Sequence, residues 1–306
     1  METLRNILVL MEPALERQAA FEAALPMARS FDARLHLLMT DYRDLHVSFY
    51  EPPAPGLVQF RESVQAAHRT TLERCVQQAA GQGVTATFEC IWGTPFHEIA
   101  VERIKALKPG LVVKQSVHHG RIERTLFTGS DWHLIRDCPA PLLLVKDPTR
   151  LVTPRILVCV DPQHLHDKPA ALDHQLLTSA MRIKDRLGGE VHALHVFALP
   201  LPVAVIGDAY VAAASMVPDD ATLAGANQSL RELLAGHGVT PERAHLRVGV
   251  PGQDIVAETL ALNVDLLVMG AVSRRRLERW FIGNTAEAVL DRVPCNVWVE
   301  KPQVAG

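Results

Sequence analysis

The sequence repeats itself, and this repeat constrains the fold more than any other feature. Four segments of the first half recur in the second half, in the same order and at an offset of about 150 residues. Such ordered self-similarity indicates a duplication, so each half is expected to fold as a copy of one unit. The matching segments are Arg5–Pro13 with Arg155–Pro162, Gly93–Ile99 with Gly249–Ile255, Leu111–Lys114 with Leu266–Met269, and Cys138–Lys146 with Val293–Lys301.

Within each copy, short apolar runs alternate with longer amphipathic stretches. The runs are typical of strands buried on both faces, and the stretches have helical spacing. This alternation predicts right-handed crossovers and a parallel sheet. We predict an α/β fold with two tandem, open, five-stranded parallel domains, 1–147 and 154–306, joined by a linker with a proline near each end. The predicted strands are 7–11, 35–39, 86–91, 111–114 and 142–145, then 156–160, 191–196, 244–248, 266–269 and 297–299, and the predicted helices include 14–30, 61–81 and 96–107.

Composition excludes several classes of function. The chain of 306 residues is 48% apolar and 21% charged, as in a globular protein, with a net charge of −3. Without a basic excess we expect no nucleic-acid partner. The five scattered cysteines form no CxxC pair and suggest no disulfide framework. The N-terminus turns polar too early for a signal peptide, and the apolar stretch 191–217 is interrupted by histidine, proline and aspartate. We therefore expect a cytoplasmic protein without a membrane partner.

Two loops of the second copy lie where an open parallel sheet binds ligands, beyond the carboxyl ends of its strands. The first loop begins with Val160 and Asp161, and the second spans 270–285. A glycine there lets backbone N–H groups approach an anion, and the following helix start offers free N–H groups and a favourable dipole. The candidate phosphate-binding residues are Gly270, Ser273, Arg274, Gly283, Asn284 and Thr285.

Each of these features also has a purely structural interpretation. Asn284 with Glu287 forms the pattern of an ordinary helix capping box. The arginines at 274, 275, 276 and 279 could form a solvated surface. The combined spacing favours phosphate binding more than any single feature does.

The combined pattern resembles the signature of the universal stress protein family, G-x2-G-x9-G followed by Ser or Thr. Here the signature reads Gly270, Ser273, nine further residues and Gly283, followed by Asn284-Thr285. The strand end Val160-Asp161 is similar to that family's Val-Asp, in which the Asp approaches the adenosine end of a bound nucleotide. The segments FIGNTAE (281–287) and DWHL (131–134) resemble the tandem two-domain subgroup.

The resemblance covers both copies and implies a Rossmann-like fold of the adenine nucleotide alpha hydrolase type. It implies a stress-response binding protein that holds ATP or a related nucleotide in its second domain only. Asp161 would then contact the ribose or adenine. Gly270, Ser273, Gly283, Asn284 and Thr285 would surround the phosphates, with Arg274 steering them. The resemblance also implies a monomer with pseudo-dimeric tandem domains, with a homodimer as the alternative.

The first copy departs further from the signature than the second, in which Ser273 replaces a glycine. Gln115 replaces the glycine that leaves the strand, His118 replaces the next one, and Glu12 stands where the second copy has an aspartate. Thr128 with Asp131 remains able to cap the following helix, which is a structural role. We interpret the first copy as a degenerate site on a retained fold.

Catalytic and metal-binding patterns are weak. His164 and His166 lie near Asp161, and His118 is followed by His119, but no third ligand has a recognisable spacing. We therefore predict no metal site. The sequence also contains no nucleophile elbow, no P-loop and no base paired with a nucleophile, so we predict no catalytic residue. We expect a binding protein rather than an enzyme.

The apolar segment 196–217 leaves an alternative function open. We predict that it forms a core helix with its entry loop, although it could also line an apolar cavity or cover a dimer surface. The chain could then be a scaffold, or a carrier of apolar, lipid-like ligands that binds no nucleotide. A slow nucleotide hydrolase is the third hypothesis.

Overall fold

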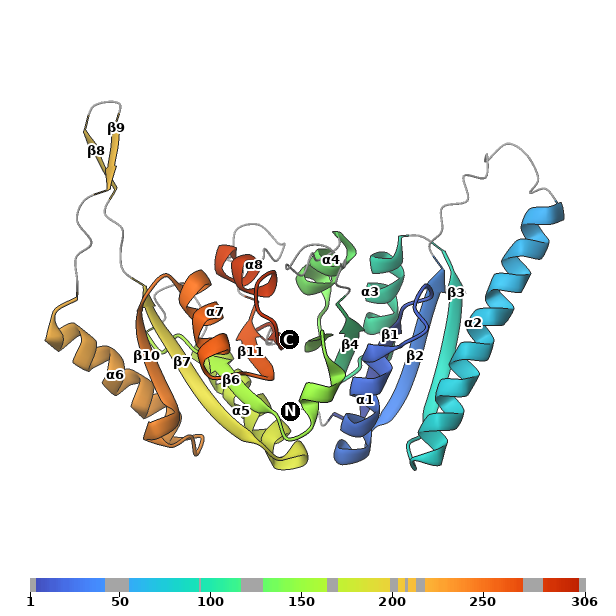
Figure 1. The fold of residues 1–306 in the computed structure, drawn as a ribbon, viewed down its shortest axis with the longest axis horizontal. Coiled ribbons are helices and arrows are strands. Elements are labelled where there is room, and N and C mark those ends of the chain that lie inside the picture. The colour runs from blue at the N-terminus through green and yellow to red at the C-terminus, as the bar shows by residue number, and fades with distance from the viewer. Residues whose placement is uncertain are drawn as a thin grey trace. The chain divides into compact units, whose positions relative to one another are not determined.

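The computed structural model describes residues 4–41, 55–93, 95–116, 129–163, 170–198, 203–206, 209–212, 218–271 and 283–302. The chain divides into two compact units. Unit 1 comprises Met1–Leu151 and Asn296–Glu300, and unit 2 comprises Val152–Cys295 and Lys301–Gly306. Figure 1 labels most of the elements of each unit.

Unit 1 is built on a mostly parallel sheet in which helices connect successive strands (Figure 1). Its strand order is β3-β2-β1-β4-β5-β12. The strand order reverses between β1 and β4, which makes this the topological switch point of the sheet. The elements are β1 (Asn6–Met11), α1 (Ala19–Phe31), β2 (Arg34–Asp41), α2 (Pro55–Gly81), β3 (Ala86–Trp92), α3 (Phe96–Leu107), β4 (Leu111–Gln115), α4 (Gly129–Asp137), β5 (Leu142–Val145), the 3-10 helix η1 (Pro148–Leu151) and β12 (Asn296–Glu300).

Unit 2 repeats the arrangement with four parallel strands in the order β10-β7-β6-β11. Its switch point lies between β6 and β11. The elements are β6 (Arg155–Cys159), α5 (Ala170–Leu187), β7 (Glu190–Ala198), β8 (Val203–Ile206), β9 (Ala209–Ala212), α6 (Asp220–Ala235), the 3-10 helix η2 (Pro241–Arg243), β10 (Ala244–Gly249), α7 (Pro251–Ala261), β11 (Leu266–Gly270) and α8 (Asn284–Leu290).

The central strands are buried on both faces, which explains why their sequences are continuous apolar runs. Ile7, Leu8 and Val9 of β1 are 0% exposed, and so are Leu157 and Val158 of β6. A strand covered by helices on both faces has no solvent side and so shows no polar alternation. The predicted α/β fold with a mostly parallel sheet is confirmed.

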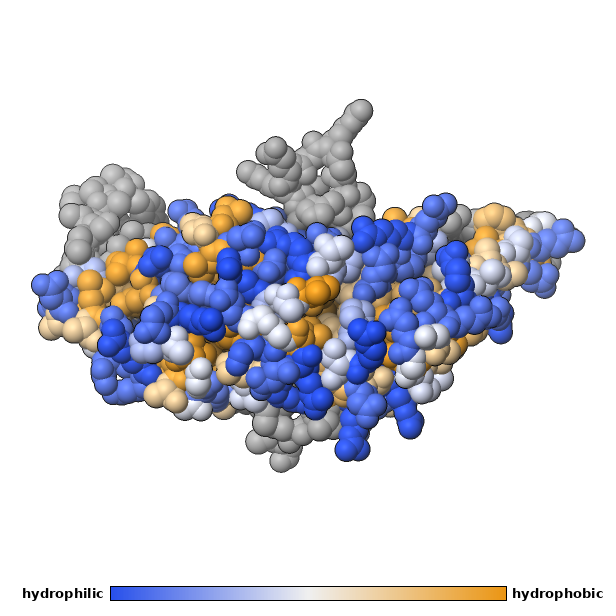
Figure 2. Space-filling model, turned by 60° about the horizontal axis from the view of Figure 1, so that its bottom comes forward, coloured by the Kyte–Doolittle hydropathy of each residue, from blue (hydrophilic) through white to orange (hydrophobic). Residues whose placement is uncertain are grey.

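Large apolar side chains are scattered rather than gathered on the surface that the structure describes. Figure 2 shows one face, on which hydrophilic residues surround small apolar areas. Scattered exposure of this kind is normal for a globular protein. The exposed large apolar residues are Val58, Phe60, Leu107, Val152, Val248, Val250 and Leu260.

Helix α1 begins at Ala19, later than the predicted start at residue 14. The side chain of Gln18 explains this later start, because it forms hydrogen bonds with the backbone of the preceding loop. Its amide oxygen accepts the Glu12 N–H at 3.1 Å, and its amide nitrogen donates to the carbonyls of Glu12 at 2.8 Å and Leu15 at 2.6 Å. These bonds satisfy backbone groups that a longer helix would have used.

The prediction of a core helix within 196–217 is wrong for the part that the structure describes. β7 continues to Ala198, and β8 and β9 form an antiparallel pair with Val203 opposite Ala212 and Ile206 opposite Ala209. The sequence between these two strands is Gly-Asp, a pair typical of hairpin turns. The β-branched residues around it favour strand over helix.

The last strand of the second copy, β12, pairs with β5 inside unit 1, an arrangement that the repeat did not predict. The two strands run antiparallel, with Val297 opposite Leu144 and Val299 opposite Leu142. An open sheet leaves the backbone groups of its outer strand without partners. The duplicated chain supplies β12 to the outer edge of β5, so this edge is covered.

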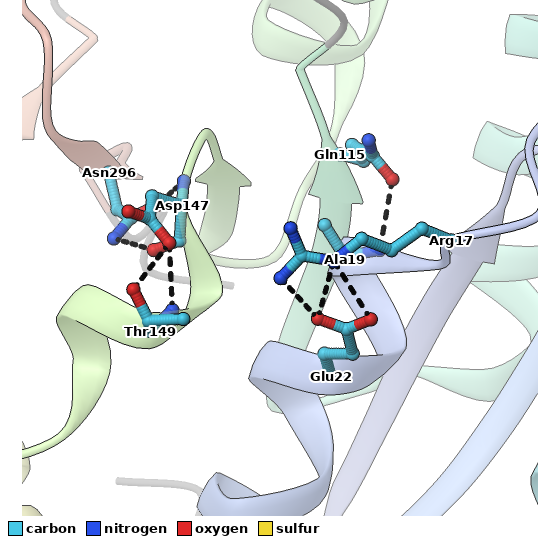
Figure 3. Close-up of polar contacts among 7 residues, drawn as sticks. All are labelled: Arg17, Ala19, Glu22, Gln115, Asp147, Thr149 and Asn296. Atoms are coloured by element: carbon cyan, nitrogen blue, oxygen red, sulfur yellow. Dashed lines mark hydrogen bonds and ion pairs between the residues drawn. The ribbon is translucent and has the colours of Figure 1, made fainter.

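Asn296, at the start of β12, bonds to the chain just after β5 (Figure 3). Its side chain is 0% exposed. The amide oxygen accepts the N–H groups of Lys146 at 2.8 Å and Asp147 at 3.0 Å, and the amide nitrogen donates to the Asp147 carbonyl at 2.8 Å. The Asp147 carboxylate in turn accepts the Thr149 N–H and hydroxyl, which starts η1.

Replacing Asn296 with Ala should lower the free energy of unfolding by about 2 to 4 kcal/mol, because buried backbone groups lose their partners. Urea unfolding followed by circular dichroism measures this change. Gln77→Ala is the control, since Gln77 is an exposed amide on α2. Equal stability of both variants would contradict the role given to Asn296.

Candidate functional site

The carboxyl ends of β6 and β11 form the edge of unit 2 at which the predicted ligand residues begin. These strands are parallel neighbours, with Val158 paired to Val268. Val160 and Gly270 each lie two residues beyond that pair, so the two strands end at the same level. The structure therefore brings the start of the Asp161 loop and the start of the glycine loop to one switch point, where open α/β sheets bind ligands.

Asp173 of α5 fixes the backbone of Asp161. Asp173 is 0% exposed. The backbone N–H of Asp161 donates to its carboxylate, and both carboxylate oxygens lie 3.2 Å from the Asp161 nitrogen. A buried carboxylate needs such donors to offset its loss of solvation. Within the described part of the chain, the Asp161 carboxylate itself makes no hydrogen bond or ion pair, and the residue is partly exposed. The Asp161 backbone is thus held in place, whereas its side chain is unpaired among the described residues.

A buried histidine of β7 supports the same turn from the other side. His195 is 2% exposed, and its Nδ1 lies 3.2 Å from the carbonyl oxygen of Val160, to which it can donate a hydrogen bond. The Val160 N–H donates to the Leu194 carbonyl at 3.0 Å. The chain leaving β6 is therefore held by both neighbouring elements before it reaches Asp161.

The glycine loop ends at α8, where Gly283 is the N-cap residue and Asn284 is the first helical residue. The interpretation of Asn284 as the cap of an ordinary capping box is therefore wrong. The Gly283 carbonyl accepts the Glu287 N–H at 3.1 Å and so begins the helical bonding. Thr285 is half-buried in the first turn.

The described residues cover only part of the predicted site. Val160, Asp161, Gly270, Gly283 and Thr285 are described. Ser273 and Arg274 lie outside the described residues, as does the side chain of Asn284.

Sequence reasoning missed the two supporting side chains, Asp173 and His195. Neither belongs to a motif, because Asp173 reads as one polar residue in a helix and His195 as one histidine in an apolar run. Their roles depend on which elements pack against the end of β6, which spacing along the chain does not reveal.

The histidines considered as metal ligands, His118, His119, His164 and His166, lie outside the described residues. Within the ranges given above, no cluster of three or more His, Cys, Asp or Glu side chains could hold a metal ion. Across the same ranges, no helix combines the length and apolar character needed to cross a membrane.

The fold is that of an open, mostly parallel α/β protein. In each repeat the strand order reverses once, and ligands bind at such switch points in proteins of this class. The model of the universal stress protein family matches residues 3–146 and again residues 153–301. The chain therefore belongs to the universal stress protein family, a family of stress-response proteins, and carries two tandem copies of its domain.

Relatives of similar length match this chain over almost its whole length. Universal stress protein E of Escherichia coli (strain K12) is 24% identical over 305 residues, which cover 99% of this chain and 95% of that protein. The universal stress protein E homolog of Haemophilus influenzae is 24% identical over 310 residues, covering 97% of each chain.

Two solved structures have the same fold. A putative universal stress protein from Pseudomonas aeruginosa UCBPP-PA14 superposes with a TM-score of 0.77 at 24% identity, covering 98% of this chain and 94% of that chain. A universal stress protein from Archaeoglobus fulgidus DSM 4304 gives a TM-score of 0.68 at 15% identity, covering 96% of this chain and 98% of that chain.

The support of the Asp161 turn can be tested by amide hydrogen exchange. Asp173→Ala should make the Asp161 amide exchange about tenfold faster or more, because that N–H loses its buried acceptor. Asp173→Asn keeps one acceptor oxygen and should have a smaller effect. Asp185→Ala on the same helix is the control, since the Asp185 side chain is 66% exposed. Unchanged exchange in Asp173→Ala would refute the support by this carboxylate.

Proposed function

We propose that this universal stress protein binds an adenine nucleotide, ATP or a close relative, through its second repeat, residues 154–306. The first repeat, 1–147, would serve as a structural partner, and the protein would act in the cytoplasm as a monomer or homodimer. The observation that carries the proposal is the partly exposed Asp161 carboxylate, which has no partner among the described residues, at the switch point beside Gly270.

The adenosine end would lie against Asp161. A carboxylate at this position can accept hydrogen bonds from the ribose hydroxyls or the adenine amino group. Its backbone is held by Asp173, so little ordering of the protein would accompany binding. Val160 would provide the apolar contact, and it is buried at the end of the strand.

The phosphates would lie along the glycine loop. Gly270 at the end of β11 would let backbone N–H groups approach an anion, and Ser273 and Thr285 would add hydroxyl donors. Gly283 and Asn284 would contribute backbone N–H groups where the loop returns to the sheet, with Arg274 attracting the phosphates. α8 alone is too short to make an anion site, so the proposal depends on the whole loop.

Replacing Gly283 with Leu should weaken nucleotide binding by about tenfold or more, because a side chain would fill the approach to the phosphates. The Gly283 φ of −74° is open to any residue, so the change should leave the fold intact. Binding is measured by isothermal titration with ATP and by mass spectrometry of small molecules extracted from the purified protein.

The control for this experiment is Gly225→Leu in α6, where an added Cβ meets no atom within 4 Å. An adenine nucleotide that is retained in this control and lost in Gly283→Leu supports the proposal. A wild-type protein that is empty, or loaded with a lipid-like molecule, contradicts it and favours the scaffold or apolar-carrier function. Phosphate release that disappears in Thr285→Ala would instead indicate slow nucleotide hydrolysis.

A further inference from the structure

Unit 1 contains a buried lysine at the end of β4, where the second repeat has Met269 at the end of β11. Lys114 is 4% exposed. Its Nζ lies 2.8 Å from Glu12 Oε1, 2.8 Å from Asp131 Oδ1 and 3.2 Å from the Gln115 carbonyl oxygen. An ammonium group has three N–H donors, and three oxygen atoms surround this one. We call Lys114, Glu12 and Asp131 the Lys114 cluster.

The cluster lies at the position in unit 1 that corresponds to the proposed nucleotide site in unit 2. Glu12 follows β1 as Asp161 follows β6, and Lys114 is paired with Leu10 next to that strand end. Asp131 lies in the first turn of α4, the helix that corresponds to α8. The cluster therefore joins the same three elements that the proposed ligand would contact in the second repeat.

Two backbone N–H groups near the cluster are also occupied. The side-chain oxygen of Gln115, which replaces the strand-leaving glycine, accepts the Ala19 N–H at the start of α1 at 3.0 Å (Figure 3). Gln18 accepts the Glu12 N–H at 3.1 Å. These two donors are satisfied by protein side chains, so they are not available to a phosphate.

The charge of Lys114 is already matched by acidic side chains. Burial by itself lowers the pKa of Lys114, but the charges of Glu12 and Asp131 outweigh this effect and raise the pKa above its ordinary value. The ammonium is therefore charged at neutral pH, and among the described residues it already faces two acidic side chains, Glu12 and Asp131. The side chains of Glu12 and Asp131 are 13% and 2% exposed, so water screens this charge weakly.

We infer that Lys114 is a specificity-determining residue that closes the strand-end site of unit 1 to nucleotides, so that only the second repeat can take a ligand. The closure of the unit 1 site by Lys114 is argued from unit 1 alone. The claim that only the second repeat takes a nucleotide rests on the proposed function. The Lys114 side chain lies at the switch point and links β4 to the residue that follows β1 and to the first turn of α4.

Amine acetylation tests whether Lys114 is enclosed. The folded full-length protein is treated with an N-hydroxysuccinimide ester, and the modification of each lysine is followed by mass spectrometry. Lys114 should react about tenfold or more slowly than the exposed Lys105 and Lys108, because the reagent needs an accessible, unprotonated amine. Reaction of Lys114 at the rate of these two lysines would overturn the inference.

Charge variants test whether the three side chains act together. Lys114→Met removes the cation beside the buried Asp131 and the partly buried Glu12, so it should lower the melting temperature and speed amide exchange in β4 and α4. The triple variant Glu12→Gln, Lys114→Met, Asp131→Asn removes all three charges and should recover most of the loss. The claim that the three side chains act together would be overturned if Lys114→Met had wild-type stability. It would also be overturned if the triple variant melted at no higher temperature than Lys114→Met. If Lys114→Met does not fold, the stability of the triple variant still tests the joint role of the three side chains, and the acetylation rate still tests whether Lys114 is enclosed.

Photolabelling with 8-azido-ATP, mapped by peptide mass spectrometry, tests the choice between repeats in the wild-type chain. Label confined to unit 2 peptides supports the inference. Comparable labelling of peptides from the β1 or β4 ends overturns it, even if unit 2 binds nucleotide. Absence of label from both units overturns the proposed nucleotide function, while slow acetylation of Lys114 would still support the closure of unit 1.

Discussion

The whole structure depends on one constraint, that parallel strands cannot be joined by hairpins. Each connection must cross the sheet through a helix, so helices cover both faces and the strands are buried. The interior of each unit is consequently apolar along its strands, and polar chemistry is concentrated at the strand ends. The two buried charged residues with the clearest roles, Lys114 and Asp173, both lie at the carboxyl-end edge, and both have partners there.

The two repeats differ in the side chains that lie at the carboxyl ends of their central strands. In unit 2, Asp173 and His195 hold the backbone around Val160 and Asp161, and the Asp161 carboxylate has no partner in the part of the chain that the structure describes. In unit 1, the corresponding Glu12 is paired with Lys114, and glutamines take the nearby backbone donors. A duplicated chain can carry this difference, because the strand-end edge of one copy can change while that of the other copy stays as it was.

Duplication also explains how unit 1 is completed. Strand β12 comes from the second copy in sequence, yet it pairs with β5 of the first. The buried amide of Asn296 joins that strand to Lys146 and Asp147, so polar bonds fix the position at which the two strands meet. Apolar strand pairs alone specify such a position weakly, because neighbouring registers bury similar residues, whereas a buried amide is satisfied in only one of them.

The sequence by itself determined the duplication, the alternation of strands and helices, and the family, because apolar runs and glycine spacing are local patterns written along the chain. It also placed Asp161 and Gly270 at strand ends. The hairpin of β8 and β9 was within reach of the sequence through its Gly-Asp pair, but overall apolarity suggested a helix instead. Tertiary structure alone decided that Lys114 meets Glu12 and Asp131, that Asp173 supports Asp161, and that β12 joins unit 1. These pairings join residues of different elements, and their energy depends on burial, which arises only when the elements pack.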